Sequence, residues 1–215
     1  MAALFDLPAI STALHRFQGE FPQINDNLAI RREELTPEMV EHILLAYRYL
    51  NTLLEKEMDL FTPAGLHSLL ELNHIVLCGS DPETRRVYFE HLQETRRSFL
   101  RQIKGIKDWV LKKRHDADPW HVATGFYSRM LSRPQLFLEG NHRTGNIILN
   151  YLLVSLGSPP YIVTVDTAQG YLDISGEIKF TEIALLMSAH RQRFRDFLKR
   201  NCHSQFILRP GEVGG

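Results

Sequence analysis

The chain has 215 residues, a length typical of one domain, and its 44% apolar and 23% charged residues are ordinary for a globular protein. Lys plus Arg and Asp plus Glu both number 25, so no net basic charge favours binding to nucleic acid or to a membrane surface. The sequence has no apolar run long enough to span a bilayer, and its first residues lack the features of a secretory signal. We therefore expect a cytoplasmic protein in which Cys78 and Cys202 are free thiols.

Helical periodicity and helix-capping residues occur along most of the chain. The approximate predicted helices are residues 10–17, 36–57, 62–79, 80–102, 109–113, 118–132, 142–156 and 181–201. Thr36-Pro37 and Asp118-Pro119 are typical helix starts, and Ser80 to Glu83 form a predicted capping box. Gly79 and Gly157 are typical helix ends.

The segments between these helices are expected to be short and mostly irregular. Residues 22–27 are predicted to be a loop, Lys104-Gly105 a helix break, and residues 161–165 the one β-like run. The pattern predicts an all-α protein without repeats. We expect an N-terminal extension over residues 1–35, a helical domain over residues 36–203, and a flexible tail over residues 204–215.

The most informative segment runs from Gln135 to Asn146 and reads Gln-Leu-Phe-Leu-Glu-Gly-Asn-His-Arg-Thr-Gly-Asn between two apolar segments. A loop that opens a helix can hold a phosphate on its backbone N–H groups. Glu139 is suited to bind a divalent cation, although an acidic residue also favours a helix N-terminus through the helix dipole. Arg143 is suited to hold phosphate oxygens. These residues are typical of an enzyme that transfers a phosphate-containing group.

With their flanks, these residues resemble the central helix–loop–helix of the Fic (filamentation induced by cAMP, or Fido) family. The family signature is His-x-Phe-x-Asp/Glu-Gly/Ala-Asn-Gly/Lys-Arg-x-x-Arg, and the matching residues are Phe137, Glu139, Gly140, Asn141 and Arg143. The resemblance is strongest over residues 118–165. It implies a Fic-like helical bundle in which Glu139 binds Mg²⁺ and the loop residues Gly140, Asn141 and Arg143 bind the phosphates of ATP or another nucleotide. It also implies AMP transfer (AMPylation) to a hydroxyl of an unknown target protein, with phosphorylation or phosphocholine transfer in other branches.

Three positions depart from the signature. Gln135 replaces the catalytic histidine, and glutamine has no usable pKa for taking a proton from the attacking hydroxyl. Asn146 replaces the second arginine and is expected to face the nucleotide in its place. His142 stands where the family has glycine or, in the phosphorylating branch, lysine. His142 is therefore a candidate replacement base or a positive charge beside the phosphate, and His121 and His115 are further candidates for the base.

Three hypotheses follow from this mixed motif. The first is a transferase with altered chemistry, which the retained residues Glu139, Asn141 and Arg143 favour. The second is a pseudoenzyme, which the glutamine at position 135 favours, that binds a nucleotide or a protein without turnover. The third is a structural helical module in which the loop has no function.

Two basic segments outside the motif are predicted to be surface charge. Arg85-Arg86 and Arg96-Arg97 alternate with glutamates at helical spacing, which is typical of a solvated helix face. His190 to Arg193, with Arg195 and Lys199, form a basic face on the last predicted helix.

Overall fold

A computed structural model of the chain describes residues 3–115 and 118–208. This part of the chain is mainly helical and its two strands have two residues each, which confirms the predicted all-α class. Its elements are β1 (Leu4–Phe5), α1 (Leu7–Asp26), α2 (Pro37–Glu55), α3 (Gly65–Cys78), α4 (Pro82–Val87), α5 (Phe89–Lys113), α6 (Pro119–Leu131), α7 (Asn141–Ser155), α8 (Val165–Phe180), α9 (Ala184–Asn201), the 3₁₀ turn η1 (Ser204–Phe206) and β2 (Ile207–Leu208).

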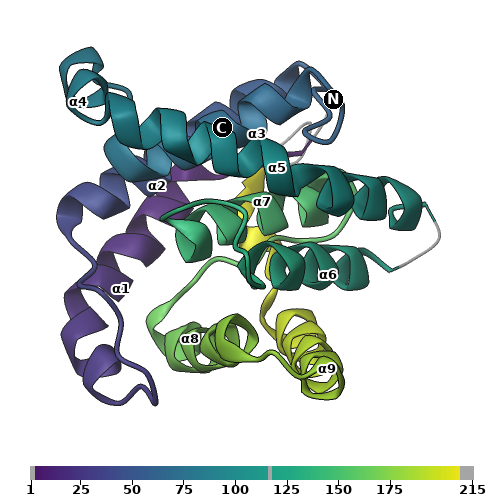
Figure 1. Cartoon of the computed structure of the whole chain (residues 1–215). Coiled ribbons are helices and arrows are strands. Elements are labelled where there is room, and N and C mark those ends of the chain that lie inside the picture. The colour runs from purple at the N-terminus through teal and green to yellow at the C-terminus, as the bar shows by residue number, and fades with distance from the viewer. Residues whose placement is uncertain (1–2, 116–117, 209–215) are drawn as a thin grey trace.

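Helix α7 lies in the middle of the bundle (Figure 1). It packs against α2, α3 and α6, and in Figure 1 α5 lies on one side of it while α8 and α9 lie on the other. Every residue from 147 to 154 is buried, as expected for a helix enclosed on all sides. The N-terminus of α7, where the motif begins its helix, is therefore held in place by the packing of the core.

Side-chain caps begin four of the helices. The caps are Asp6, Thr36, Asp81 and Asp118, and each accepts a hydrogen bond from the backbone N–H three residues later. The predicted starts at Thr36 and Asp118 are confirmed. The start predicted over Ser80 to Glu83 is confirmed in place, since α4 begins at Pro82, but the cap contact joins Asp81 to Thr84 and not Ser80 to Glu83.

Two predicted interruptions of helices are absent. The loop predicted over residues 22–27 is wrong, because α1 continues through Pro22 to Asp26 and buries Phe17 and Phe21. The break predicted at Lys104-Gly105 is also wrong, because α5 runs through it to Lys113. The break falls instead at Tyr88, between α4 and α5.

The largest error concerns the segment after Gly157. Residues 161–164 belong to no helix or strand, and the backbone of Tyr161 pairs instead with the side chain of Asn150, which accepts from its N–H (2.8 Å) and donates to its carbonyl (2.8 Å). Helix α8 follows and was not predicted, and α9 begins at Ala184 rather than at residue 181. Gly176 of α8 lies so close to Arg32 that a Cβ added to it would be 2.7 Å from Nη2 of that arginine.

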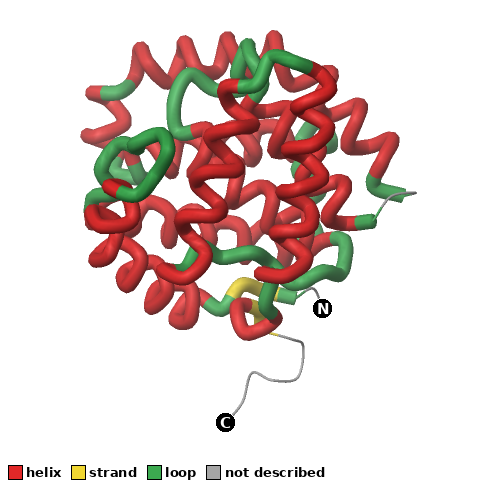
Figure 2. The backbone as a smooth tube through the Cα atoms, turned by 90° about the horizontal axis from the view of Figure 1, so that it is seen from below, coloured by secondary structure: helices red, strands yellow, loops and turns green. Residues whose placement is uncertain are grey.

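Both ends of the described chain take part in the fold. Helix α1 packs against α2 and α8 in the same core, so residues 7–26 belong to the bundle and do not extend from it. Strands β1 and β2, yellow in Figure 2, pair antiparallel with Leu4 opposite Leu208. Of the predicted flexible tail, residues 204–208 are therefore ordered, and residues 209–215 lie outside the described part. None of the described helices is long and apolar enough to cross a membrane.

Candidate functional site

The motif loop is held in shape by the side chain of Asn141. Its Oδ1 accepts a hydrogen bond from the N–H of Phe137 (3.1 Å), and its Nδ2 donates to the carbonyl of Phe137 (2.8 Å). Phe137 is buried and stacks on Phe99 of α5, with the ring centroids 5.6 Å apart. Both polar atoms of the Asn141 side chain are therefore used to fix the loop.

Gly140 is the position at which the loop turns into α7. Its φ of 69° lies in the left-handed region, which glycine adopts without steric cost. The buried Asn73 of α3 fastens this turn, because its Nδ2 donates to the carbonyl of Glu139 (3.0 Å) and to Oγ1 of Thr144 (3.0 Å). Asn73 was not predicted from the sequence, because it lies more than 60 residues before the motif.

The first turn of α7 is open to an anion. No side chain caps this helix, and its first intrahelical hydrogen bond runs from the N–H of Thr144 to the carbonyl of Gly140 (2.9 Å). The preceding N–H groups, those of residues 141–143, have no acceptor within the helix. Such groups, together with the helix dipole, favour a negatively charged ligand.

Two cavities meet at this helix end. The smaller, of about 220 Å³, is lined by the motif loop from Gln135 to Arg143 and by Lys179 of α8. The larger, of about 320 Å³, lies between α1, α2 and α8 and is lined mainly by apolar side chains. His142, Arg143 and Lys179 line both cavities. A phosphate at the motif loop would therefore have an apolar chamber beside it.

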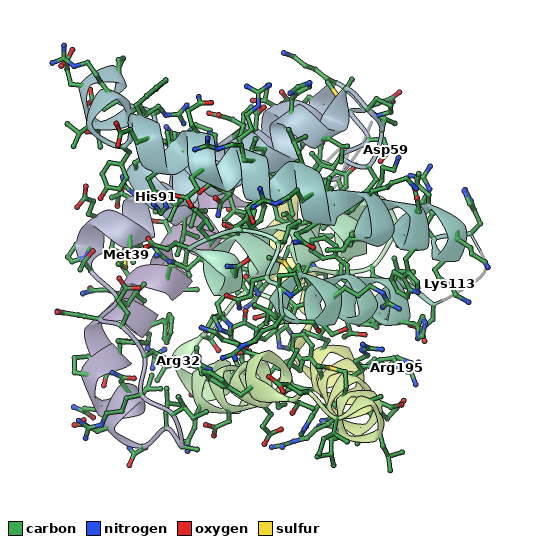
Figure 3. The ribbon with its side chains drawn as sticks, viewed as in Figure 1. Arg32, Met39, Asp59, His91, Lys113 and Arg195 are labelled. Atoms are coloured by element: carbon green, nitrogen blue, oxygen red, sulfur yellow. The ribbon has the colours of Figure 1, made fainter. Side chains whose placement is uncertain are left out.

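Three cationic side chains converge at the junction of the cavities. Arg143 belongs to the motif and Lys179 comes from α8. Arg32, which is labelled in Figure 3, comes from the segment between α1 and α2. Burial lowers the pKa of Arg143, and burial together with Arg32 and Arg133 lowers the pKa of Lys179. Within residues 3–115 and 118–208, neither Arg32 nor Lys179 forms an ion pair with a carboxylate. The site is therefore electropositive, and an anion would stabilise it.

Only Arg143 has an acidic neighbour, and the contact is loose. Its Nη2 lies 3.9 Å from Oε2 of Glu33, whose side chain is 74% exposed. A salt bridge so exposed contributes little free energy and is easily replaced by a ligand. The other end of the guanidinium donates to the carbonyl of Val76 (3.4 Å) and so orients the side chain.

His142 is a neutral residue in the wall between the cavities. Burial, with Arg32 and Lys179 adding to it, lowers its pKa to about 3. Arg32 can only donate, and its Nη1 lies 3.5 Å from Nε2 of His142, so the ring proton is assigned to Nδ1, which faces the hydroxyl of Tyr127 (3.3 Å). That hydroxyl lies 2.8 Å from the hydroxyl of Tyr171. A histidine with such a low pKa is a weak base at neutral pH.

The remaining predicted residues occupy different parts of the site. Gln135 lines the smaller cavity, where its Nε2 lies 3.4 Å from the carbonyl of Leu131 and its Oε1 lies 3.5 Å from Nδ2 of Asn141. Asn146 lines only the larger cavity and accepts from the hydroxyl of Tyr47 (3.4 Å). His121 and His115 line neither cavity, so neither is placed to act as the base.

Glu139 is the carboxylate on which a metal would depend. Its side chain is 67% exposed beside the smaller cavity, and its Oε2 lies 4.0 Å from Nε2 of His91 on α5. In the described part of the chain, no group of three or more His, Cys, Asp or Glu side chains could hold a metal ion. One accessible carboxylate fits Mg²⁺ that is bound mainly by phosphate oxygens and water.

Curated proteins similar to this chain are named protein adenylyltransferases. "Protein adenylyltransferase fic-1" of Caenorhabditis elegans is 32% identical over 136 residues, which are 59% of this chain and 26% of that protein. The protein of the same name from Caenorhabditis briggsae is 31% identical over the same shares of the two chains. "Protein adenylyltransferase Fic" of Nematostella vectensis is 23% identical over 149 residues, 64% of this chain and 33% of that protein. The chain is thus similar, over about 60% of its length, to proteins named as Fic adenylyltransferases.

The chain spans only about a quarter to a third of the length of those relatives. No family model matches it, and no solved structure matches it. This similarity supports the resemblance inferred from the motif. Three residues that shape this site, Arg32, Asn73 and Lys179, lie outside the motif and were not predicted from the sequence. Only the Arg31-Arg32 pair carried any signal, and a short basic pair by itself is common on protein surfaces.

Proposed function

We propose that this protein binds a nucleotide, with the phosphate chain at the N-terminus of α7 and the nucleoside in the larger cavity. The main support is the convergence of Arg32, Arg143 and Lys179 on a helix end whose first N–H groups are open. Charge-assisted hydrogen bonds to phosphate are among the strong polar contacts in proteins. The apolar lining of the larger cavity suits the faces of a nucleobase.

ATP with Mg²⁺ is the nucleotide that we propose. The relatives are named adenylyltransferases, and Glu139 is an accessible carboxylate beside the proposed phosphate position. Bound Mg²⁺ would neutralise part of the phosphate charge. Gly140 lets the chain turn towards the ligand, while Asn141 keeps the loop in shape. Asn146 would then contact the nucleoside side of the ligand, since it lines only the larger cavity.

Transfer of AMP to a protein hydroxyl is the second function that we propose, at a low rate. The names of the relatives favour it, and Gln135 opposes it, because the attacking hydroxyl must lose a proton. His142 is too weak a base to replace the missing histidine. Without a general base, a rate typically falls by about 10²-fold to 10⁴-fold. Nucleotide binding without efficient turnover is thus the function that the geometry supports best.

Calorimetric titration with ATP, with and without Mg²⁺, tests the binding proposal. We expect saturable, Mg²⁺-dependent binding to the wild type that Arg143→Ala weakens strongly. If neither ATP nor any other nucleotide binds, the proposal is wrong. A transfer assay with labelled ATP on the wild type and on Gln135→His then tests turnover, and a gain of activity in Gln135→His alone would show that only the base is missing.

A further inference from the structure

A second electropositive groove lies away from the motif, between α6 and α9. It has a volume of about 290 Å³, and Trp109 of α5 forms one of its walls. Three arginines line it, Arg129 of α6 and Arg191 and Arg195 of α9. None of its lining residues also lines either cavity at the motif loop. The basic face of α9, predicted to be plain surface charge, thus has part of its charge turned towards another helix.

Arg129 is held by the aromatic wall of the groove. Its guanidinium carbon lies 3.8 Å from the centroid of Trp109, and Nη1 donates to the carbonyl of Gly125 (3.0 Å). Burial lowers its pKa to about 10, and the charge of Arg191 adds to this effect. An arginine stacked on tryptophan loses little mobility when it binds a ligand, because its plane is already fixed.

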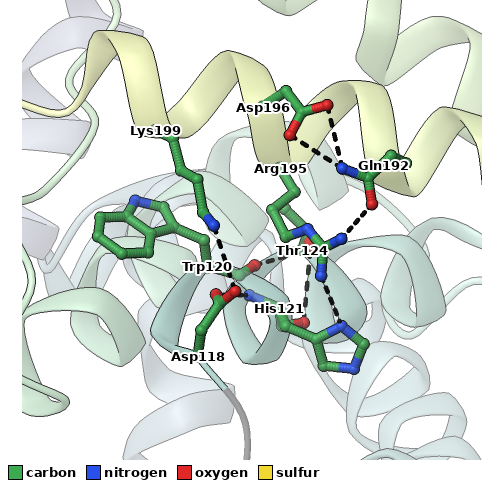
Figure 4. Close-up of polar contacts among 8 residues, drawn as sticks. All are labelled: Asp118, Trp120, His121, Thr124, Gln192, Arg195, Asp196 and Lys199. Carbon is green, nitrogen blue, oxygen red and sulfur yellow. Dashed lines mark hydrogen bonds and ion pairs between the residues drawn. The ribbon is translucent and has the colours of Figure 1, made fainter.

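The two arginines of α9 are fixed by polar contacts with α6 and with their own helix. Arg191 donates from Nε to Oγ of the buried Ser128 (2.7 Å), and burial lowers its pKa. Figure 4 shows Arg195 reaching from α9 towards the ring of His121, where Nη1 lies 3.4 Å from Nδ1. Its Nη2 donates to the side chain of Gln192. The guanidiniums are thus positioned before any ligand arrives.

The acidic residues near the groove are engaged elsewhere. Asp118 pairs with Lys199 (3.3 Å), and Asp196 accepts from Gln192 on its own helix (2.9 Å), as Figure 4 shows. Among the residues that the structure describes, no aspartate or glutamate lines the groove. Within residues 3–115 and 118–208, the three arginines form no ion pair, whereas Arg193 on the same helix pairs with Glu177 (2.7 Å).

We propose that this groove binds a phosphate monoester. Arginine side chains present planar pairs of N–H donors that match phosphate oxygens, and three of them suit a compact dianion. The face of Trp109 is already covered by Arg129, which leaves no platform there for a nucleobase. Ser188 and Gln192 line the groove and can add neutral hydrogen bonds to the ester. The monoester can belong to a phosphorylated protein side chain or to a free small molecule.

The fluorescence of Trp109 offers a local test. The chain has two tryptophans, and Trp120 does not line the groove, so the Trp120→Phe variant leaves Trp109 as the reporter. In that variant, with Arg143→Ala added to disable the motif site, we would titrate inorganic phosphate and a phosphoserine peptide at constant ionic strength. We expect a saturable change in fluorescence with phosphate and with the peptide, and none with chloride.

Arg195→Gln in the same background supplies the decisive comparison. It removes one guanidinium without touching Trp109, and we expect affinity to fall at least about tenfold. Arg193→Gln is the matched control on the same helix and should leave the affinity unchanged. Tighter binding of the phosphopeptide than of inorganic phosphate would identify a protein ligand, and equal affinities would identify a free phosphate compound.

Two results would overturn the proposal. The first is a fluorescence change that does not saturate or that chloride reproduces. The second is equal phosphate affinity with and without Arg195→Gln while circular dichroism shows both proteins folded. Because Arg143→Ala is present throughout, a failure of nucleotide binding at the motif site would not affect this outcome.

Discussion

Arg32 provides the sharpest test of the motif site, because it is a residue that the family signature does not contain. Arg32→Ala removes a guanidinium whose Nη2 donates to the carbonyl of Leu172 (2.7 Å) and whose Nη1 lies 3.5 Å from His142. A hydrogen bond to a charged group is worth about 1.5–3 kcal/mol. If Arg32 contacts the phosphates, the dissociation constant for ATP should rise by about 10-fold to 150-fold.

The adjacent Arg31 supplies the matched control. Arg31 also lines the larger cavity, but its side chain is 72% exposed and pairs with Asp26 (3.0 Å), so Arg31→Ala should change the ATP affinity by less than about twofold. Arg32→Lys should fall between the wild type and Arg32→Ala, because it keeps the charge but loses the planar pair of donors. Isothermal titration calorimetry with Mg²⁺-ATP measures all three.

The contact with Leu172 requires a check on folding, since Arg32→Ala also loosens the link to α8. Thermal unfolding of each variant shows whether the protein is folded at the temperature of the titration. ATP binding by folded Arg32→Ala within twofold of the wild type would refute the assignment of Arg32 to the phosphate site. It would leave the phosphates to Arg143 and Lys179, the described arginine and lysine that line the smaller cavity.

Three further predictions concern stability. Gly140→Ala should lower it by about 1–2 kcal/mol and the Tm by about 2–8 °C in calorimetry, because φ is 69° and the new Cβ would lie 3.2 Å from Asn73; an unchanged Tm would contradict this. His142 has a pKa of about 3 in the folded protein instead of 6.5, so its ring is protonated at a higher pH in the unfolded chain than in the folded one. The free energy of unfolding should therefore fall as the pH falls from about 6.5 towards 3. Between pH 7 and pH 5, the free energy of unfolding measured with urea should fall by about 2 kcal/mol more in the wild type than in His142→Gln. Equal decreases in the two proteins would argue against a buried neutral ring. Asn150→Leu should cost about 2–6 kcal/mol in urea unfolding, because the N–H and carbonyl of Tyr161 lose their partner, and a loss below 1 kcal/mol would show that they find another.

Helices that carry their own start and stop signals could be predicted from the sequence. Thr36-Pro37 and Asp118-Pro119 begin α2 and α6, and Gly79 ends α3. Helix α8 could not be predicted in this way, because its two glycines are unfavourable for a helix when considered locally. They are accommodated by tertiary packing, since Gly170 lies against the ring of Phe197 and Gly176 lies against Arg32.

In the candidate site too, the local features could be predicted from the sequence and the contacts between distant segments could not. The residues of the motif lie within one short segment, and the loop–helix transition at Gly140 was expected from the residue types. The cations from outside the motif are Arg32 and Lys179, which lie 110 residues before and 37 residues after His142 in the sequence. No periodicity of the sequence links them to the motif. Lys179 also sits on the helix that was missed, so its place in the site followed only from the packing of α8 against α1.

The loss of motif residues and the gain of cations fit one physical account of the site. Asn146 lacks the charge of the family's second arginine, and Arg32 and Lys179 bring positive charge to the same junction from two other elements. Gln135, in contrast, has no substitute, because His142 is held neutral with a pKa of about 3 by burial and by those same two cations. The charges that would strengthen phosphate binding therefore weaken the nearest replacement base. On the proposed function, binding and catalysis are in conflict at His142, and this site favours binding.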